Sequence, residues 1–251
     1  MGYVIKKENE KQFMDQLLKE YDLYAPVVKE GEGCFSDTGY IGYDKIYSFD
    51  EIEWDHKSDY SFKEILTPIN ETLFYFTEDQ MTEPSLPEKK VLIFLRSCDL
   101  HAVKRLDQIY LKNGAEDFYY KRRRELVKFA LIGCDTTCQS GFCVSMQTNQ
   151  TDEYDIYMKP VKDGWIIDCK DESLAGAATS FSMEEMDITP DFVTENKEQV
   201  TLPKNFPMTA SQMISGKNMG AAVLHVAAVT SYVQPVPVLL CRTSSIRTMK
   251  M

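Results

Sequence analysis

The stretch that decides the fold is KVLIFLRSCDLHAVKRLDQIYL, residues 90–111. Residues 90–96 form a continuous apolar run with the length of a buried strand. Over 99–111 the apolar side chains recur at the spacing of one helical face. A second buried strand is expected at FALIG, residues 129–133, after a charged helix over 119–127. This strand–helix–helix–strand unit predicts two neighbouring parallel strands in an α/β sheet.

The flanking sequence predicts further elements around this unit. Apolar spacing predicts a helix over 8–21, whereas residues 22–46 are typical of short strands and turns. A helix that starts near Ser61 must end or kink at Pro68, and residues 154–167 are typical of a hairpin. The expected fold is α/β: a mixed sheet with a parallel strand pair that carries a cysteine-rich loop, in one main domain followed by an irregular C-terminal tail.

Composition and charge exclude several classes of protein. The 251 residues are 43% hydrophobic and 27% charged, which excludes a collagen and a disordered tail protein. A net charge of −11 argues against binding to a nucleic acid. The N-terminus has no apolar segment typical of a secretory signal, and the longest apolar run, 219–229, is too short for a bilayer. We therefore expect a cytoplasmic protein with no membrane partner, whose seven cysteines are reduced thiols or metal ligands.

The charge distribution divides the chain near residue 200. All 39 Asp and Glu residues lie in positions 1–200, together with 23 of the 28 Lys and Arg residues. Residues 201–251 carry five basic side chains and no acidic one. Native domains rarely show such a break in composition. The expected boundaries are therefore a main domain at 1–200 and an aberrant segment at 201–251.

Four cysteines are placed where two buried strands end. Cys98 follows the first strand, and Cys134 follows the second, with Cys138 and Cys143 close behind it in the chain. Because the carboxyl ends of parallel strands share one edge of a sheet, these four thiols are expected to converge there. Four Cys thiolates are the usual ligands of an iron–sulfur cluster. We predict one 4Fe–4S cluster on these residues, which would serve as both its metal ligands and its cofactor-binding residues.

Other interpretations of the cysteines stay open at this point. A free cysteine is often a small buried hydrophobe, which is the interpretation we give to Cys34 and Cys169. Zinc is a second possibility, because Cys134 and Cys138 are separated by three residues. The chain has no CxxC sequence, which weakens the case for a dithiol redox site. The basic cluster KRRR at 121–124 is either a solvated helix face or a docking patch for an acidic partner.

Five segments, in this order, resemble the A-subunit family of anaerobic sulfite reductase, which is related to the β subunit of sulfhydrogenases. They are GCFSDTGYIGY at 33–43, KEILTPINETLFYF at 63–76, VLIFLRSCDLHAVKRLDQIYL at 91–111, DFYYKRRRELVKFALIGCD at 117–135 and FCVSM at 142–146. The resemblance covers roughly residues 22–167, and RSCDLHA and FCVSM are its most specific parts.

The resemblance implies an electron-transfer role without a catalytic residue in this chain. Such a protein would relay electrons from a flavin- and NAD-binding subunit to a sirohaem subunit that reduces sulfite to sulfide. The chain would then be a non-catalytic part of a NADH-dependent oxidoreductase. A hydrogenase-type electron-transfer subunit or a zinc-stabilised binding module without redox activity is the alternative.

The C-terminal segment departs from the family, whose members carry a ferredoxin-like segment with closely spaced cysteines. After Val200 only Cys241 remains. In a shifted reading frame, the last base of one codon joins the first two bases of the next. The shifted codon therefore ends in GT wherever the next residue is Val, and TGT encodes Cys. Val223, Val226, Val229 and Val233 would then have the C-x₂-C-x₂-C-x₃-C spacing of bacterial ferredoxins. We expect a frameshifted or truncated member, in which the tail replaces a ferredoxin-like 4Fe–4S domain. The other possibility is a genuine apolar C-terminal segment.

Overall fold

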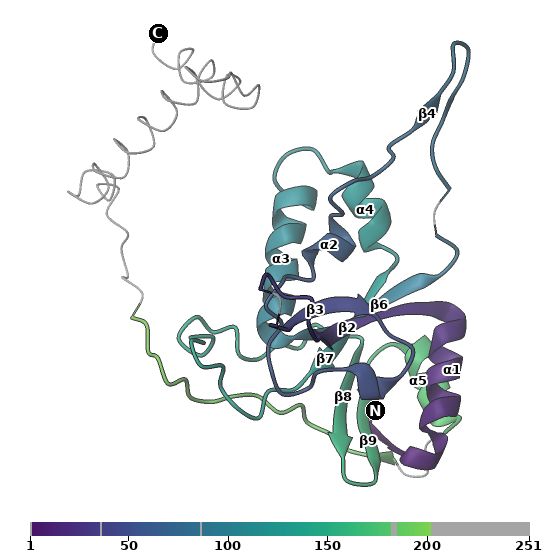
Figure 1. Ribbon diagram of the computed structural model, residues 1–251. Helices are drawn as coiled ribbons and strands as arrows, with labels where there is room; N and C mark the ends of the chain where they lie inside the picture. The colour runs from purple at the N-terminus through teal and green to yellow at the C-terminus, as the bar shows by residue number, and fades with distance from the viewer. Residues whose placement is uncertain (1, 36, 86, 182–184, 202–251) are drawn as a thin grey trace, which may run out of the picture. The chain divides into compact units, whose positions relative to one another are not determined.

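The fold is organised around one mixed sheet of eight strands (Figure 1). The computed structural model describes residues 2–35, 37–85, 87–181 and 185–201. Across the sheet the order is β10-β1-β9-β8-β7-β6-β2-β3. The strands span β1 Gly2–Lys6, β2 Tyr21–Lys29, β3 Tyr40–Lys45, β6 Lys90–Arg96, β7 Val127–Ile132, β8 Ile156–Val161, β9 Gly164–Cys169 and β10 Glu185–Met186. The predicted mixed α/β sheet is confirmed, whereas every prediction for residues 202–251 lies outside the described residues.

The centre of the sheet is parallel, as the two apolar runs predict. Strands β6 and β7 pair in parallel from Val91 opposite Val127 to Arg96 opposite Ile132. The parallel region also includes β2 beside β6 and β8 beside β7. The remaining strands pair in antiparallel fashion, including the expected β8–β9 hairpin. The two strands that precede cysteines are therefore neighbours that end at the same edge.

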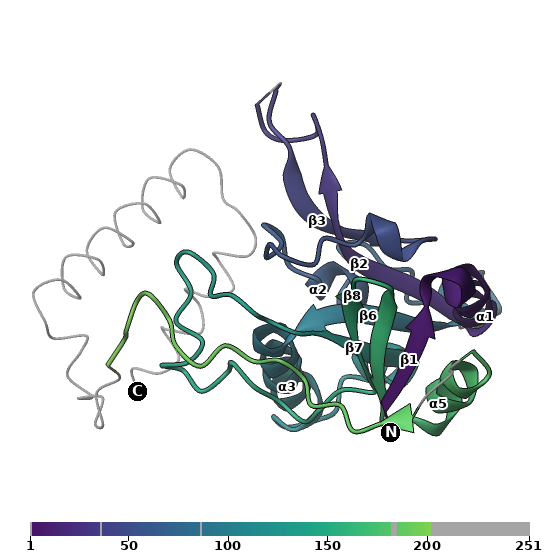
Figure 2. The same ribbon diagram turned by 90° about the horizontal axis from the view of Figure 1, so that it is seen from below.

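Alternate side chains of the central strands enter two separate apolar cores. Leu92 and Phe94 of β6 belong to one core, and Ile93 and Leu95 to the other. Figures 1 and 2 show helices on both faces of the sheet. The first core is covered by α1 Glu10–Glu20 and α5 Glu172–Thr179, and the second by α2 Lys63–Leu66, α3 Ser97–Leu111 and α4 Phe118–Arg124. Burial of both sheet faces explains why the central strands are continuously apolar.

Three minor elements complete the described chain. Two 3₁₀ turns lie at η1 Lys7–Asn9 and η2 Phe49–Glu51. A short hairpin of β4 Tyr75–Phe76 and β5 Met81–Thr82 forms a second, two-stranded sheet. Figure 1 shows this hairpin standing away from the other elements.

The ends of two predicted helices are set by the residues that follow them. The charged helix ends at Arg124 instead of residue 127, because Val127 is buried in β7 and pairs with Val91. As expected, α2 does not continue through Pro68: it ends at Leu66, because the proline ring cannot continue a helix.

The compact unit of the main domain ends at Val200. No helix among its described residues is both long enough and apolar enough to cross a bilayer.

Candidate functional site

Neighbouring strand ends position the first two cysteines of the candidate site. Arg96 and Ile132 are paired at the ends of β6 and β7, and each lies two residues before a cysteine. Cys98 lies in the first turn of α3, whereas Cys134 opens the loop between β7 and β8. Both are partly buried at the carboxyl edge of the parallel sheet. The structure thus places these two predicted residues side by side at the edge where α/β sheets bind ligands.

Cys138 and Cys143 lie further along the same loop. Cys138 is exposed and Cys143 is partly buried. The Asn196 amide lies 3.5 Å from the Cys143 sulfur, accepts a hydrogen bond from the Val144 N–H at 2.6 Å and donates one to the Thr137 hydroxyl at 2.7 Å.

The segment that contains Asn196 lies along the cysteine loop. The Cys134 N–H donates to the Asp191 carbonyl at 3.1 Å, and the Asn149 side chain donates to the Val193 carbonyl at 2.8 Å. Both ribbon views show the two segments near one another (Figures 1 and 2). The cysteine loop contains no helix or strand, and these side-chain and main-chain hydrogen bonds hold it in place.

The thiols of Cys98 and Cys134 are influenced by the charges around them. Burial, followed by the charge of Asp99, raises the pKa of the Cys98 thiol to about 12 against the opposing effect of Lys57. The charges of Cys134 and Cys138 contribute to the same increase. Burial also raises the pKa of Cys134, Arg96 opposes this, and Cys138 and Cys143 add to it. Thiols with raised pKa values are protonated at neutral pH, so metal binding here would release protons.

Two cations lie against the thiols. The buried Arg96 guanidinium donates to the Cys134 sulfur at 3.4 Å, and Lys57 Nζ lies 3.8 Å from the Cys98 sulfur. Arg96 also donates to the main-chain carbonyls of Trp54 and His56 at 2.6 and 3.0 Å. Residues 54–57 are therefore tied to the edge of the sheet, with two positive charges directed at sulfur atoms.

The described cysteine side chains do not form a closed coordination sphere. Across the described ranges, no three Cys, His, Asp or Glu side chains are arranged to hold a metal ion. The donor set is nonetheless chemically suited to iron–sulfur clusters or zinc, because thiolate sulfur binds both. The assignment of Cys98, Cys134, Cys138 and Cys143 as ligands remains a prediction.

The other described cysteines lie away from this edge. Cys169 is buried in the first core at the end of β9, in agreement with a packing role. Cys34 is exposed, with its sulfur 3.9 Å from the Tyr60 hydroxyl, and so is not the core residue that we expected.

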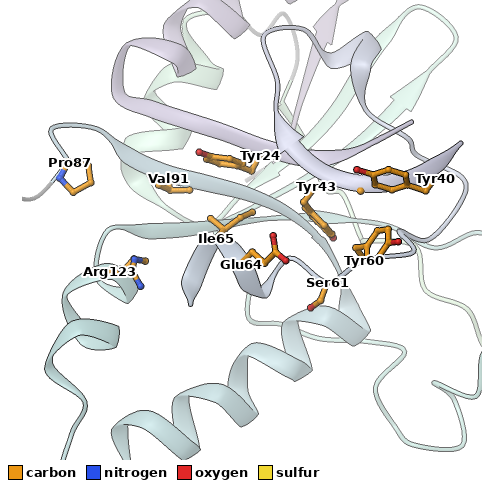
Figure 3. A pocket seen from close by; sticks show the side chains of 11 residues that line it. Tyr24, Tyr40, Tyr43, Tyr60, Ser61, Glu64, Ile65, Pro87, Val91 and Arg123 are labelled. Atoms are coloured by element: carbon orange, nitrogen blue, oxygen red, sulfur yellow. The ribbon is translucent and has the colours of Figure 1, made fainter. Parts of the chain in front are cut away.

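A pocket of about 570 Å³ lies between the β2–β3 face and α2 (Figure 3). Tyr24, Tyr40, Tyr43 and Tyr60 contribute its aromatic walls, and the Tyr40 and Tyr60 rings meet edge to face at 5.0 Å between centroids. Burial and then the charge of Asp99 raise the pKa of Tyr43 far above its usual range, and Arg96 and Cys98 also act on it. Tyr43 of this pocket therefore lies within electrostatic range of residues 96–99 at the cysteine edge.

Sequence reasoning missed the residues that support the thiols. The apolar run marks Arg96 only as the end of a strand, and the cysteine that it contacts, Cys134, is 38 residues away. Lys57 and Asn196 are 41 and 53 residues from the cysteines that they contact, so no local pattern identifies them.

A known protein is similar to this chain over most of its length. The β subunit of sulfhydrogenase 2 from Pyrococcus furiosus is 29% identical over 201 residues, which is 78% of this chain and 55% of the relative. The chain thus spans about half the length of that relative. No family model matches the chain, and no solved structure matches it significantly. This chain is therefore similar, over most of its length, to a subunit of a sulfhydrogenase.

Proposed function

We propose that this chain is an iron–sulfur electron-transfer subunit of a cytoplasmic oxidoreductase complex. The observation that carries the proposal is that Cys98 and Cys134 follow paired strand ends at one sheet edge, with the cations of Lys57 and Arg96 against their sulfur atoms. The relative is by name a subunit of a sulfhydrogenase, which supports an assembly of several chains. Electron transfer through clusters held by cysteines is the chemistry that fits both observations.

In this proposal Cys98, Cys134, Cys138 and Cys143 hold one 4Fe–4S cluster. When bound, the cluster accepts and passes on single electrons. Arg96 and Lys57 would offset the negative charge of four thiolates, and the hydrogen bond from Arg96 to the Cys134 sulfur would favour the reduced state. Asn196 would hold Cys143 in place through its contact with the sulfur and the adjacent main chain.

Metal analysis of the chain purified without oxygen tests this assignment. We expect iron and acid-labile sulfide, and we expect Cys98→Ser and Cys143→Ser each to lower the iron content at least severalfold, because a cluster needs all its ligands. Cys34→Ser is the matched control, because the Cys34 thiol lies away from the cysteine edge. This variant should contain as much iron as the unaltered chain. One zinc per chain with no sulfide would establish the zinc-stabilised module instead. Full iron in both ligand variants would mean that other residues hold it.

Two terminal partners are consistent with the proposal. The segments at 91–111 and 142–146 favour the A-subunit of an anaerobic sulfite reductase, which would work between a sirohaem subunit and its flavin- and NAD-binding electron donor. The similarity to a sulfhydrogenase β subunit favours a hydrogenase complex about equally.

An assay of the reconstituted complex distinguishes these partners. The chain is mixed with the flavin- and NAD-binding subunit, together with either the sirohaem subunit or a hydrogenase catalytic subunit. NADH consumption is then followed with sulfite or protons as acceptor. We expect sulfite-dependent consumption only after the reading frame is restored, so that positions 223, 226, 229 and 233 become Cys and the ferredoxin-like ligands return. Equal turnover by the 251-residue chain would show that the altered segment is not on the electron path.

A further inference from the structure

The protruding hairpin and its flanks, residues 69–83, expose an unusual density of large apolar side chains. We call this segment the arm; it includes β4 and β5 and lies between α2 and β6 in the chain. Phe76 is 77% exposed and Met81 is 70% exposed, whereas a typical large apolar side chain in this domain is buried. The other exposed apolar residues of the arm are Ile69, Leu73, Phe74 and Tyr75. Such a cluster in a soluble domain marks an interaction site.

The base of the arm is held by α4. The Arg123 side chain forms an ion pair with Glu71 and donates to the Leu66 carbonyl at 2.7 Å. Directly after β5, Glu83 forms an ion pair with Arg122 at 2.8 Å. Both ends of the arm are thereby fixed to one helix, so the apolar tip is presented at a defined place. A fixed presentation lowers the entropic cost of binding.

These contacts also explain the basic cluster at 121–124. Lys121 pairs with Glu116 and Arg124 with Asp107, in addition to the two pairs at the arm. All four cations are therefore engaged by acids of the same chain. The cluster supports the arm and α3, and is not a free docking patch for an acidic partner.

Charge narrows the kind of surface that the arm fits. Between Lys63 and Lys89 the sequence contains six acidic residues and no basic one. Glu78 and Asp79 lie in the turn at the tip, directly between the exposed apolar residues of the two strands. An acidic, aromatic tip is complementary to an apolar groove bordered by Lys and Arg.

We propose that the arm inserts into an apolar groove with a basic border on another protein subunit of the same electron-transfer complex. This inference rests on the proposed function for the identity of that complex. Acidic residues at the tip disfavour an anionic bilayer, because polybasic segments are the ones attracted to it. A second copy of this chain is disfavoured by its net charge of −11, since like-charged surfaces repel.

The test is assembly of the full chain with its proposed partners. The chain is co-expressed with the flavin- and NAD-binding subunit or with the sirohaem subunit, and affinity is measured on the purified proteins by biolayer interferometry. The triple variant Phe74→Ser, Phe76→Ser, Met81→Ser should bind one of these subunits at least about tenfold more weakly, since exposed aromatic anchors carry much of the binding energy of an interface. Phe35→Ser is the matched control, because Phe35 is also 77% exposed but lies outside the arm; this variant should bind like the unaltered chain.

A second pair of substitutions tests the basic border. Neutralising the tip with Glu78→Gln and Asp79→Asn should slow association at low salt and flatten its dependence on salt, because charged rims act mainly on association rates. If the salt dependence of association did not change, the groove on the partner subunit would not have a basic border.

Four further results would overturn the proposal. The triple variant could bind as tightly as Phe35→Ser, or the unaltered chain could bind neither subunit. Light scattering could show that the chain alone is a dimer and the triple variant a monomer, which would identify a second copy as the occupant. Binding to vesicles of anionic phospholipid that depends on the arm would identify a membrane instead. Iron and sulfide contents of the same preparations test the cluster proposal alone, whereas the binding measurements test the arm. A chain that holds iron and sulfide but does not use the arm for binding would therefore contradict only the inference about the arm.

Discussion

Arg96 is the residue on which the cysteine edge depends most. It is only 5% exposed, and its guanidinium connects residues 54–56 with Cys134. A buried guanidinium is stable because carbonyl oxygens and a sulfur surround it, and these acceptors would lose their partner if the side chain were shortened or made apolar.

We therefore expect Arg96→Met to lower the free energy of unfolding by about 2–4 kcal/mol, because it leaves buried carbonyls unsatisfied. Chemical denaturation followed by circular dichroism measures this change. Arg105→Met is the control, since Arg105 is exposed on α3 and its loss should cost less than about 0.5 kcal/mol. A loss below about 1 kcal/mol for Arg96→Met would show that water replaces the guanidinium at this edge.

At the scale of elements, α5 depends on a single acidic cap. Asp171 accepts hydrogen bonds from the N–H groups of Ser173 and Leu174 at 3.1 and 3.3 Å. It also pairs with Lys128 of β7 at 2.6 Å, which connects the helix to the centre of the sheet. Burial alone would raise the pKa of Asp171, but the hydrogen bonds from Lys128, Ser173 and Leu174 outweigh it and lower the pKa to about 2.

This lowered pKa predicts a specific pH dependence. The carboxylate is more acidic in the folded than in the unfolded chain, so its stabilisation is complete above about pH 4 and is lost as the pH falls to about 2. Asp171→Asn should lower the free energy of unfolding at pH 7 by about 1–2 kcal/mol, and the difference from the unaltered chain should shrink between pH 4 and pH 2. Denaturant titrations of both chains at pH 7 and pH 3 measure this difference in the free energy of unfolding.

Asp15→Asn is the control for this prediction, because Asp15 is exposed on α1. The free energy of unfolding of this variant should differ from that of the unaltered chain by close to zero at both pH values. A difference for Asp171→Asn that does not change with pH would mean that the cap acts through geometry and not through its charge.

At the scale of the whole molecule, the two cores belong to the first 200 residues. Both cores lie on one continuous sheet, and the partly buried residues packed against them extend to Phe192. The segment around Asn196 contacts the cysteine loop, and the compact unit ends shortly after it, at Val200.

We expect a chain that ends at Thr201 to fold and to retain the free energy of unfolding of the 251-residue chain within about 1 kcal/mol. Thermal and denaturant unfolding of the two forms measures this difference. Iron content should also be equal, because the four predicted ligands and their supporting residues lie before residue 201. A loss of several kcal/mol would show that residues 202–251 contribute to the structure.

Some elements could not be predicted because their stability comes from partners distant in sequence. The strand β1 is five residues long and has no distinctive pattern, yet it pairs with β9 from Gly2 opposite Asp168 to Lys6 opposite Gly164. The exposed arm also lacks a local signal for its position, because α4 is what holds it.

The sequence by itself determined the central parallel strands, the helices between them and the placement of four cysteines after two strand ends. These features depend on hydrophobic periodicity and on neighbours within a few residues, which the sequence displays directly. Only the tertiary structure decided that Arg96, Lys57 and Asn196 contact the thiols, and that α4 fixes the arm. Those contacts join residues up to 57 positions apart, and which of them form depends on how the packed sheet brings separate segments together.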